Sequence, residues 1–245
     1  MLEDMDEIKK QKKFYEEFWE DYKYQEKYAF YVAVQDRLPA IKNVWSNLEN
    51  PDKVLDFGCG NGVLTYLLKC NGFGKSILGV DISIKGIQNA QKFFSKNGLS
   101  FKSLDEFWLK NKERFDVIVS SHVFEHINNP DEILKKIQNL SDWLIIEVPL
   151  ENAFWPNLIS IVRRKPRMNN PLGHVNFWSK NSFQHFIENN NFLVVKDYQY
   201  ASAPFSKYSH WIKCFFQRFI LKIFGINIYG LLMATHYIVL IRKQN

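Results

Sequence analysis

Short apolar runs alternate with amphipathic stretches along most of the chain. Most of these runs, KVLDF and DWLIIEVPL among them, are apolar nearly throughout and lack the alternating polar positions of a half-exposed strand. Such runs are typical of strands that are covered on both faces. The run LSFKSL is weaker. Strands are predicted at residues 53–57, 76–83, 99–104, 114–121, 142–150, 192–198 and 235–241.

The segments between these strands show the apolar spacing of three and four residues that predicts helices. Gly98 stands where a helix C-terminus is often capped, and Pro130 and Asp131 suit a helix start. Strands and helices that alternate in this way form βαβ units, so the predicted fold class is α/β with a parallel sheet. Helices are expected at residues 63–70, 85–98, 131–140, 179–191 and 211–225.

The N-terminal segment, residues 6–36, predicts a helix with one aromatic face and acidic residues between the rings. Such a face must be buried against another part of the protein. It can pack plainly on the domain, or it can form a lid whose rings close a pocket. The rings that recur at spacings of three and four are Phe14, Tyr15, Phe18, Trp19 and Tyr22.

Two late segments, residues 151–178 and 199–232, interrupt the pattern of strands and helices. The first contains four basic residues within five positions, and guanidinium groups suit phosphate. We therefore expect an anionic small molecule at this segment, with a solvated loop as the alternative. The arginines concerned are Arg163, Arg164 and Arg167.

The second late segment contains the aromatic sequence WIKCFFQRFILKIFG, with three basic residues on an otherwise apolar surface. We expect this helix to pack on the last strand as part of the core, and the alternative is contact with a membrane interface. Residues 223–241 lack Asp, Glu, Lys and Arg and are long enough to span a bilayer. Because their last part has the pattern of a strand, we expect no membrane span.

The composition is that of one globular domain, residues 1–245. Hydrophobic residues make up 46% of the chain and the formal net charge is +6, values that exclude a disordered or collagen-like protein. Three cysteines show no paired spacing, and the segment MLEDMDEIKK is too charged for a signal peptide. A cytoplasmic location is therefore expected.

The chemically informative segment is the glycine turn DFGCGNG, which runs from Asp56 to Gly62 between a strand and a helix. Glycines at alternate positions let the backbone approach a ligand where a Cβ would collide. The dinucleotide fingerprint G-x-G-x-x-G fails at its third glycine. Asp56 would attract an ammonium group, and Asp81 at the end of the second strand would bind ribose hydroxyls. These features favour a ligand with a ribose, a cationic amino acid head and no phosphate.

At these positions the chain resembles the class I S-adenosylmethionine-dependent methyltransferases, over roughly residues 45–198 and the last strand. VLDFGCGNGVL looks like their first motif, and GVDIS looks like their second-strand motif. FDVIVSSHVFEHI and GHVNFWSKNSF resemble the branch that includes ubiquinone-biosynthesis and sugar O-methyltransferases. The resemblance implies a Rossmann-like, seven-stranded, mostly parallel sheet with helices on both faces and an antiparallel last strand.

The resemblance also implies S-adenosyl-L-methionine as cofactor, held by residues 45–150. Residues 1–44 then form the lid, and residues 151–178 and 199–232 receive the acceptor. Carried over residue by residue, the glycines cradle the cofactor, and the other positions contact its amino group, ribose, adenine or methionine part. The expected cofactor-binding residues are Asp56, Gly58, Gly60, Gly62, Asp81, Ile82, Asp105, Ser120, Ser121 and His122. The expected acceptor-binding residues are Tyr15, Trp19, Arg163, Arg164 and Arg167.

His122, Glu125 and His126 formally match the zinc motif H-x-x-E-H. That motif needs both histidines on one helical face, whereas here it follows a buried strand, so we expect no metal. A histidine can instead take a proton from a hydroxyl acceptor near neutral pH. We expect His126 or His174 to be this base, with Glu125 as the orienting group. The alternative is that His174 only caps a turn.

These expectations favour an enzyme that methylates an oxygen of a small, anionic acceptor, such as a phosphorylated or nucleotide-linked sugar in surface glycan biosynthesis. A quinone, lipid or nucleic-acid acceptor is an alternative, as is a membrane-peripheral scaffold that binds the cofactor without catalysis. Nucleic acid is disfavoured, because SSHVFEH stands where base methylases carry a D/N-P-P-Y/F motif.

Overall fold

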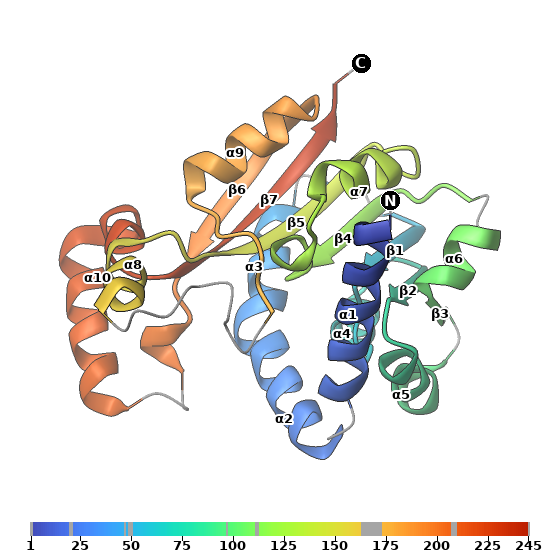
Figure 1. The fold of residues 1–245 in the computed structure, drawn as a ribbon, viewed down its shortest axis with the longest axis horizontal. Helices are drawn as coiled ribbons and strands as arrows, with labels where there is room; N and C mark the ends of the chain where they lie inside the picture. The colour runs from blue at the N-terminus through green and yellow to red at the C-terminus, as the bar shows by residue number, and fades with distance from the viewer. Residues whose placement is uncertain are drawn as a thin grey trace.

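The computed structural model describes residues 2–19, 22–46, 48, 51–96, 98–110, 113–162, 173–206 and 210–244. Seven strands form one sheet in the order β3-β2-β1-β4-β5-β7-β6 (Figure 1). Neighbouring strands are parallel except at β7, which is antiparallel to β5 and β6, so the predicted fold is confirmed. The strands are β1 (Lys53–Phe57), β2 (Ser76–Asp81), β3 (Leu99–Ser103), β4 (Val117–Ser121), β5 (Trp143–Leu150), β6 (Phe192–Tyr200) and β7 (Thr235–Lys243).

Helices connect the strands, and hydroxyl side chains begin two of them. The Ser83 hydroxyl accepts a hydrogen bond from the Gly86 amide, and Ser179 forms a capping box with Ser182. The described helices are α1 (Leu2–Phe18), α2 (Tyr22–Val32), η1 (Ala33–Arg37), α3 (Leu38–Trp45), α4 (Val63–Cys70), α5 (Ile84–Phe94), α6 (Leu104–Lys110), η2 (Phe124–His126), α7 (Pro130–Ile137), α8 (Phe154–Val162), α9 (Lys180–Asn189), η4 (Ala203–Phe205) and α10 (Trp211–Leu232).

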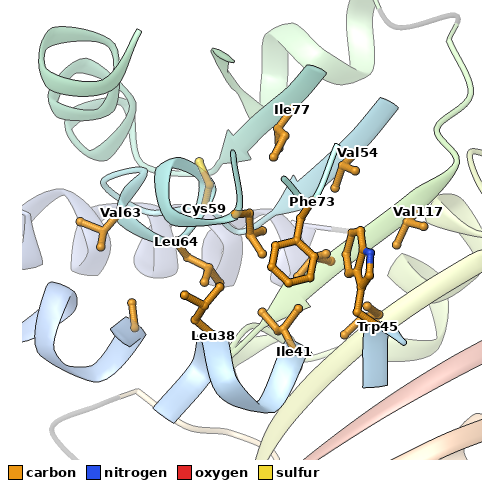
Figure 2. Packing of buried hydrophobic residues seen from close by; sticks show 14 of the residues in the cluster. Leu38, Ile41, Trp45, Val54, Cys59, Val63, Leu64, Phe73, Ile77 and Val117 are labelled. Atoms are coloured by element: carbon orange, nitrogen blue, oxygen red, sulfur yellow. The ribbon is translucent and has the colours of Figure 1, made fainter. Parts of the chain in front are cut away.

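The sheet is the middle of three layers. Val54 packs with apolar residues of α3, α4 and α5, whereas the next residue, Leu55, packs with those of α6, α7 and α9. Figure 2 shows the first cluster, in which the rings of Trp45 and Phe73 meet edge to face with centroids 4.5 Å apart. Because both faces are covered, the strands need no polar alternation, which explains their continuous apolar runs.

The prediction of a single N-terminal helix over residues 6–36 is wrong in detail. The structure has two helices there, with α1 ending at Phe18 and α2 beginning at Tyr22, and α2 continues through η1 into α3. Two helices can follow different directions, so α1 crosses the edge of the sheet while α3 packs against its face (Figure 1). Periodicity alone could not show this break, because the aromatic spacing continues through it.

The expected core position of the 211–225 helix is also wrong. α10 extends to Leu232 and buries only Cys214, Gln217 and Tyr229 among its residues. The last strand is covered instead by α3 on one face, and by α9 on the other, where Phe183 meets Tyr237. Within the described chain α10 is the one helix whose length and mean hydropathy would allow it to cross a membrane. The candidate span at 223–241 is not one helix, because its last part is strand β7, as expected.

Candidate functional site

Most of the functional residues predicted from the sequence, among those the structure describes, gather at one edge of the sheet. The parallel strands β1, β2, β4 and β5 all end there, β6 ends beside them, and the antiparallel β7 begins there. In open α/β sheets, ligands bind at the carboxyl ends of the strands, where the strand order reverses. In this sheet that point lies between β1 and β4.

The glycine loop after β1 has the left-handed backbone that glycine favours. The angle φ is 83° at Gly58, 55° at Gly60 and 79° at Gly62. A Cβ added at Gly58 would collide with the side chain of Val123, and one added at Gly62 would lie 2.8 Å from Ala90. These two glycines are therefore required by packing within the domain. Gly60 faces outward from the loop, and a Cβ added there would lie 2.6 Å from the ring of Trp19.

Two buried carboxylates flank the loop. Asp81 accepts hydrogen bonds from the amides of Gly60, at 2.7 Å, and Ser83, at 2.8 Å. Asp56 accepts one from the hydroxyl of Thr65, at 2.6 Å. Burial raises the pKa of each aspartate to about 6, against the lowering effect of these hydrogen bonds. Asp81 thus fixes the loop conformation directly, since it accepts a hydrogen bond from the amide of Gly60.

Helix α1 lies across this edge and contacts several of its elements. Lys12 forms an ion pair with Asp105, with nitrogen and oxygen 2.9 Å apart. Glu16 accepts hydrogen bonds from the amides of Ile84 and Lys85 at the start of α5. Trp19, directly after α1, lies on the glycine loop. The position of α1 is that of a lid, and its role as a lid stays a prediction.

Tyr15 of α1 is placed deeper in the site. Its ring meets the His126 imidazole edge to face, with centroids 5.6 Å apart. Burial raises the pKa of Tyr15, and the negative charges of Glu125 and Asp81 raise it further, so the phenol stays protonated. Gln11, one turn earlier, donates a hydrogen bond to the backbone carbonyl of His126. Both predicted lid residues, Tyr15 and Trp19, therefore face the site.

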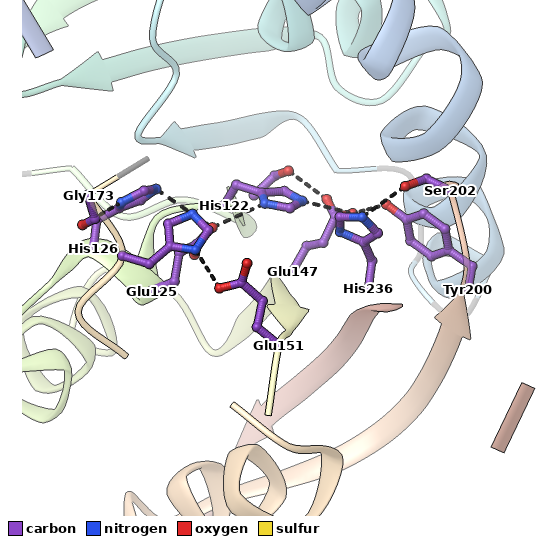
Figure 3. Close-up of polar contacts among 11 residues, drawn as sticks. His122, Glu125, His126, Glu147, Glu151, Gly173, Tyr200, Ser202 and His236 are labelled. Atoms are coloured by element: carbon purple, nitrogen blue, oxygen red, sulfur yellow. Dashed lines mark hydrogen bonds and ion pairs between the residues drawn. The ribbon is translucent and has the colours of Figure 1, made fainter. Parts of the chain in front are cut away.

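His122 is a half-buried imidazole between two buried carboxylates (Figure 3). Its Nδ1 lies 3.1 Å from an oxygen of Glu125, and its Nε2 lies 3.7 Å from one of Glu147. Burial and the charge of Arg37 lower the pKa of His122, but the two carboxylates outweigh them and raise it to about 9. The residue also has a φ of 57°, a sparsely populated conformation for a side chain with a Cβ.

Glu147 joins strands β4, β5 and β6. It accepts hydrogen bonds from the hydroxyl of Ser121, at 2.5 Å, and from that of Tyr200. Burial alone would raise its pKa, but the hydrogen bond and charge of His122 outweigh burial and hold the pKa below its usual value. The imidazole of His236 stacks on Tyr200, with centroids 5.1 Å apart. Burial lowers the pKa of His236 to about 3, so this ring is neutral.

A second histidine group lies closer to the lid. His126 donates from Nδ1 to the carbonyl of Gly173, at 3.2 Å, so its Nε2 carries the lone pair when the ring is neutral. Burial lowers the pKa of His126. His174 is buried, and its Nδ1 lies 2.6 Å from Glu151 (Figure 3). His126 and His174 meet edge to face, with centroids 4.7 Å apart.

Both groups could hold a metal ion by their donor atoms. Glu125, His126 and His174 each offer one such atom, and these atoms lie within 4.8 Å of one another. His122, Glu147 and His236 form a second group of this kind. The zinc motif itself is not on one α-helix, because His122 directly follows β4 and the other two residues lie in the 3₁₀ helix η2. The expectation of no metal stays a prediction.

A cavity of about 610 Å³ opens next to the Glu147 group. Burial, and then the charge of Glu147, raise the pKa of the lining residue Asp36 to about 6. No Lys or Arg is among the described residues that line this cavity. Its lining residues are Tyr31, Gln35, Asp36, Pro39, Ala40, Tyr198, Gln199, Tyr200, Ala201, Phe205, Leu221 and Ile226.

Some of the remaining predicted residues lie at the site, and others lie outside the described residues. Ser120 is buried at the end of β4, and its hydroxyl has no hydrogen-bond partner in the described part of the chain. Ile82 follows Asp81 and is half-buried. Arg163, Arg164 and Arg167 lie outside the described residues. The structure therefore brings together the cofactor-side residues and both histidine candidates, whereas the proposed phosphate contacts are not described.

Sequence reasoning missed several charged or polar residues of the site, namely Glu16, Asp36, Glu147, Tyr200 and His236. A signal existed for one of them, because Glu147 interrupts the otherwise apolar strand LIIEVPL. A carboxylate in such a strand is buried, and buried carboxylates are paired. The others could not be found in this way, since their partners come from distant segments.

The residues at this edge fit the adenosyl and methionine parts of S-adenosylmethionine. The test is the carboxylate of Asp81, which accepts from the amides of Gly60 and Ser83 and has lone pairs left for ribose hydroxyls. The buried, unpartnered hydroxyl of Ser120 is one further polar group available to the ligand among the described residues.

Comparison with known proteins bears on the family of this chain. Residues 21–197 match the family described as methyltransferase domain. The chain is 38% identical over 90 residues to ubiquinone biosynthesis O-methyltransferase of Pelagibacter ubique, which covers 36% of this chain and 37% of that protein. It is 29% identical over 177 residues to the mitochondrial human enzyme of that name, covering 65% of this chain and 46% of that protein. The chain thus spans less than half the length of these relatives.

Solved structures show the same fold at low sequence identity. A putative methyltransferase bound to the Trm112 activator of Haloferax volcanii has a TM-score of 0.57 at 16% identity, covering 84% of this chain and 89% of that chain. Coclaurine N-methyltransferase, solved with N-methylheliamine and SAH, has a TM-score of 0.56 at 15% identity, covering 86% and 72%. These likenesses support the fold alone.

Proposed function

Because this chain belongs to the methyltransferase domain family, we propose that it transfers the methyl group of S-adenosylmethionine to a ring hydroxyl of an apolar, quinone-type acceptor. The family and the class of enzyme agree with the sequence prediction. The quinone acceptor was the alternative there, and the relatives named for ubiquinone biosynthesis now favour it over a sugar.

The bound cofactor supplies a methyl group already activated on a sulfonium, so the protein need only position the reactants and take a proton. Asp81, whose conformation is fixed by the Gly60 amide, would bind the ribose hydroxyls, and Asp56 would favour the cationic amino group. Ser120 and Ser121 end β4 beside the methionine part. The Glu147 group and the cavity lie on the other side of β4, where the acceptor binds.

The observation that carries the acceptor proposal is the cavity lining. Its side chains are mostly aromatic or aliphatic, with Asp36 as the one carboxylate among the described lining residues. A phosphate would lack a cation there, and Asp36 would repel it. An aromatic ring with hydroxyl groups fits better, because Tyr31, Tyr198 and Tyr200 can pack against it and accept or donate hydrogen bonds.

The base in this proposal is His126, which lies beside Tyr15 on the lid side of the site and is not among the described residues that line the cavity, so the reacting hydroxyl must extend from the cavity toward it. Its Nδ1 is held by Gly173, which fixes the tautomer and leaves Nε2 as the acceptor. A lowered pKa keeps the ring neutral at physiological pH. Glu125, 3.7 Å from Nε2, stabilises the imidazolium that forms.

The test is turnover of the purified full chain with S-adenosylmethionine and three acceptor classes. These are short-chain catechols related to ubiquinone precursors, nucleotide-linked sugars and phosphorylated sugars, and the readout is S-adenosylhomocysteine. Turnover with the catechols is expected, and Asp81→Asn should abolish it. Turnover with the sugars alone would refute the acceptor proposal and restore the glycan alternative. Failure to bind S-adenosylhomocysteine in calorimetry would refute the enzyme class itself.

A further inference from the structure

Helix α10 leaves an apolar face in solvent. Its inner face holds Cys214, Gln217 and Tyr229, the three residues it buries. The opposite face carries large apolar side chains at spacings of three and four residues, where a helix on a globular protein usually carries polar ones. This outer stripe, with side chains 43% to 62% exposed, consists of Ile212, Phe215, Phe216, Phe219 and Ile223.

Helix α8 extends the exposed apolar area. It contacts α10, and Figure 1 shows the two helices side by side at the end of the molecule opposite α5 and α6. None of the residues of α8 is buried, and none is charged. Its exposed aromatic and aliphatic side chains include Phe154, Trp155 and Ile159. We call the outer stripe and these three residues the docking surface.

The charges that α8 and α10 themselves carry are of one sign. Neither α8 nor α10 contains Asp or Glu, whereas α10 contains three cations. At 3.6 residues per turn, Lys213 projects along one side of the outer stripe and Lys222 along the other. Arg218 is held inward, since it donates a hydrogen bond to the carbonyl of Pro204 at 2.8 Å. An apolar stripe bordered by lysines complements a surface of acyl chains and anionic headgroups.

The backbone of α10 favours a helix that lies in a membrane surface over one that crosses it. Gly225 has φ 72° and ψ 175°, which interrupts the helix. The parts on either side, residues 211–224 and 226–232, are each shorter than the roughly 20 residues of a span. The buried inner face also remains attached to the domain.

We propose that the docking surface binds the interface of an anionic phospholipid bilayer, with α10 parallel to the membrane plane. This goes beyond the proposed function, because it depends on neither the cofactor nor the acceptor. It has one consequence for access to the site. Leu221 and Ile226 of α10 line the cavity beside Tyr200, so docking places the cavity on the inner side of a membrane-bound helix.

The experiment is cosedimentation of the full chain with vesicles of phosphatidylcholine alone and of phosphatidylcholine mixed with phosphatidylglycerol. We expect binding to the mixed vesicles that weakens with salt. The variant Phe215→Gln/Phe219→Gln should bind at least about tenfold more weakly, because two rings leave the acyl region. Lys213→Glu/Lys222→Glu should lose the preference for anionic lipid. Leu109→Gln, on the exposed end of α6, is the matched control and should bind like the wild type.

Two results would overturn the proposal. One is the absence of vesicle binding by a protein whose thermal unfolding is normal, and the other is binding that the Phe215→Gln/Phe219→Gln variant retains in full. Sedimentation velocity without lipid tests the main alternative, in which the docking surface binds a second copy of the chain. A dimer that dissociates in this variant, with no vesicle binding by the wild type, would assign the surface to a second copy of the chain instead.

Discussion

The ion pairs of His122 with two buried carboxylates lead to a prediction about stability whose size can be worked from the structure. We expect His122→Asn to leave Glu125 and Glu147 without the charge that pairs them. Asparagine is chosen because it tolerates the left-handed backbone at this position, where φ is 57°. The substitution therefore removes the charge and retains an acceptable backbone.

The magnitude follows from the pKa. A value raised from 6.5 to about 9 corresponds to roughly 3 kcal/mol of stabilisation by the protonated ring. Removing one partner of a buried ion pair typically costs about 3–5 kcal/mol, which is consistent. Because the folded-state pKa is the higher one, this stability is fully present below about pH 6.5 and is lost as the pH rises through about 9.

The assay is urea unfolding of wild type and variant between about pH 6 and pH 10. The free energy of unfolding should differ by roughly 3 kcal/mol at the acid end, and the difference should shrink toward the alkaline end. His185→Asn on α9 is the control, since that imidazole is 74% exposed, and it should change stability by less than about 0.5 kcal/mol. A His122→Asn deficit that is absent, or equally large at both ends of the range, would refute the reasoning.

Two further predictions concern catalysis and cofactor binding. His126→Ala should lower kcat by about 10²–10⁴-fold and remove the fall in rate on the acid side of the wild-type pH profile, whereas His185→Ala should leave both unchanged; a normal profile in His126→Ala would transfer the role of base to another group. Gly60→Ala should weaken S-adenosylhomocysteine binding by about tenfold or more in calorimetry, because a Cβ there meets Trp19 at 2.6 Å and φ is 55°. Gly72→Ala shares the strained backbone but has no atom within 4 Å of the added Cβ, so equal losses of affinity in both variants would count against a ligand-facing Gly60.

The parts of the fold that the sequence predicts are those specified by local pattern. All seven strands lie close to their predicted positions, and the inner strands β1, β4 and β5 were the plainest, because a strand covered on both faces is apolar nearly throughout. The edge strands β3 and β6 carry exposed polar positions. The glycine turn was recognisable for a related reason, since alternating glycines between a strand and a helix have few other uses. The break between Phe18 and Tyr22 was not recognisable, because rings on both sides keep the helical spacing.

The helix α10 shows how a correct pattern led to a wrong position. Its apolar periodicity predicted a helix, and the structure has one. The same apolar residues suggested core packing, yet the last strand is already covered by α3 and α9. Whether a helical face finds a partner depends on which other helices cover the sheet. A periodic pattern predicts that a helix has an apolar face. Which element, if any, covers that face depends on the fold.

The acceptor side of the site lies beyond sequence reasoning for a more general reason. Glu147 could have been noticed as a carboxylate in an apolar strand, but its partners Ser121, His122 and Tyr200 come from two other strands and the turn after one of them. The effect of Glu147 and His122 on each other depends on distances of a few ångströms across the sheet. It raises the pKa of His122 and lowers that of Glu147. A buried charge in a strand therefore indicates that partners exist, and it directs the search to the neighbouring strands at the same register, which here leads to the cavity.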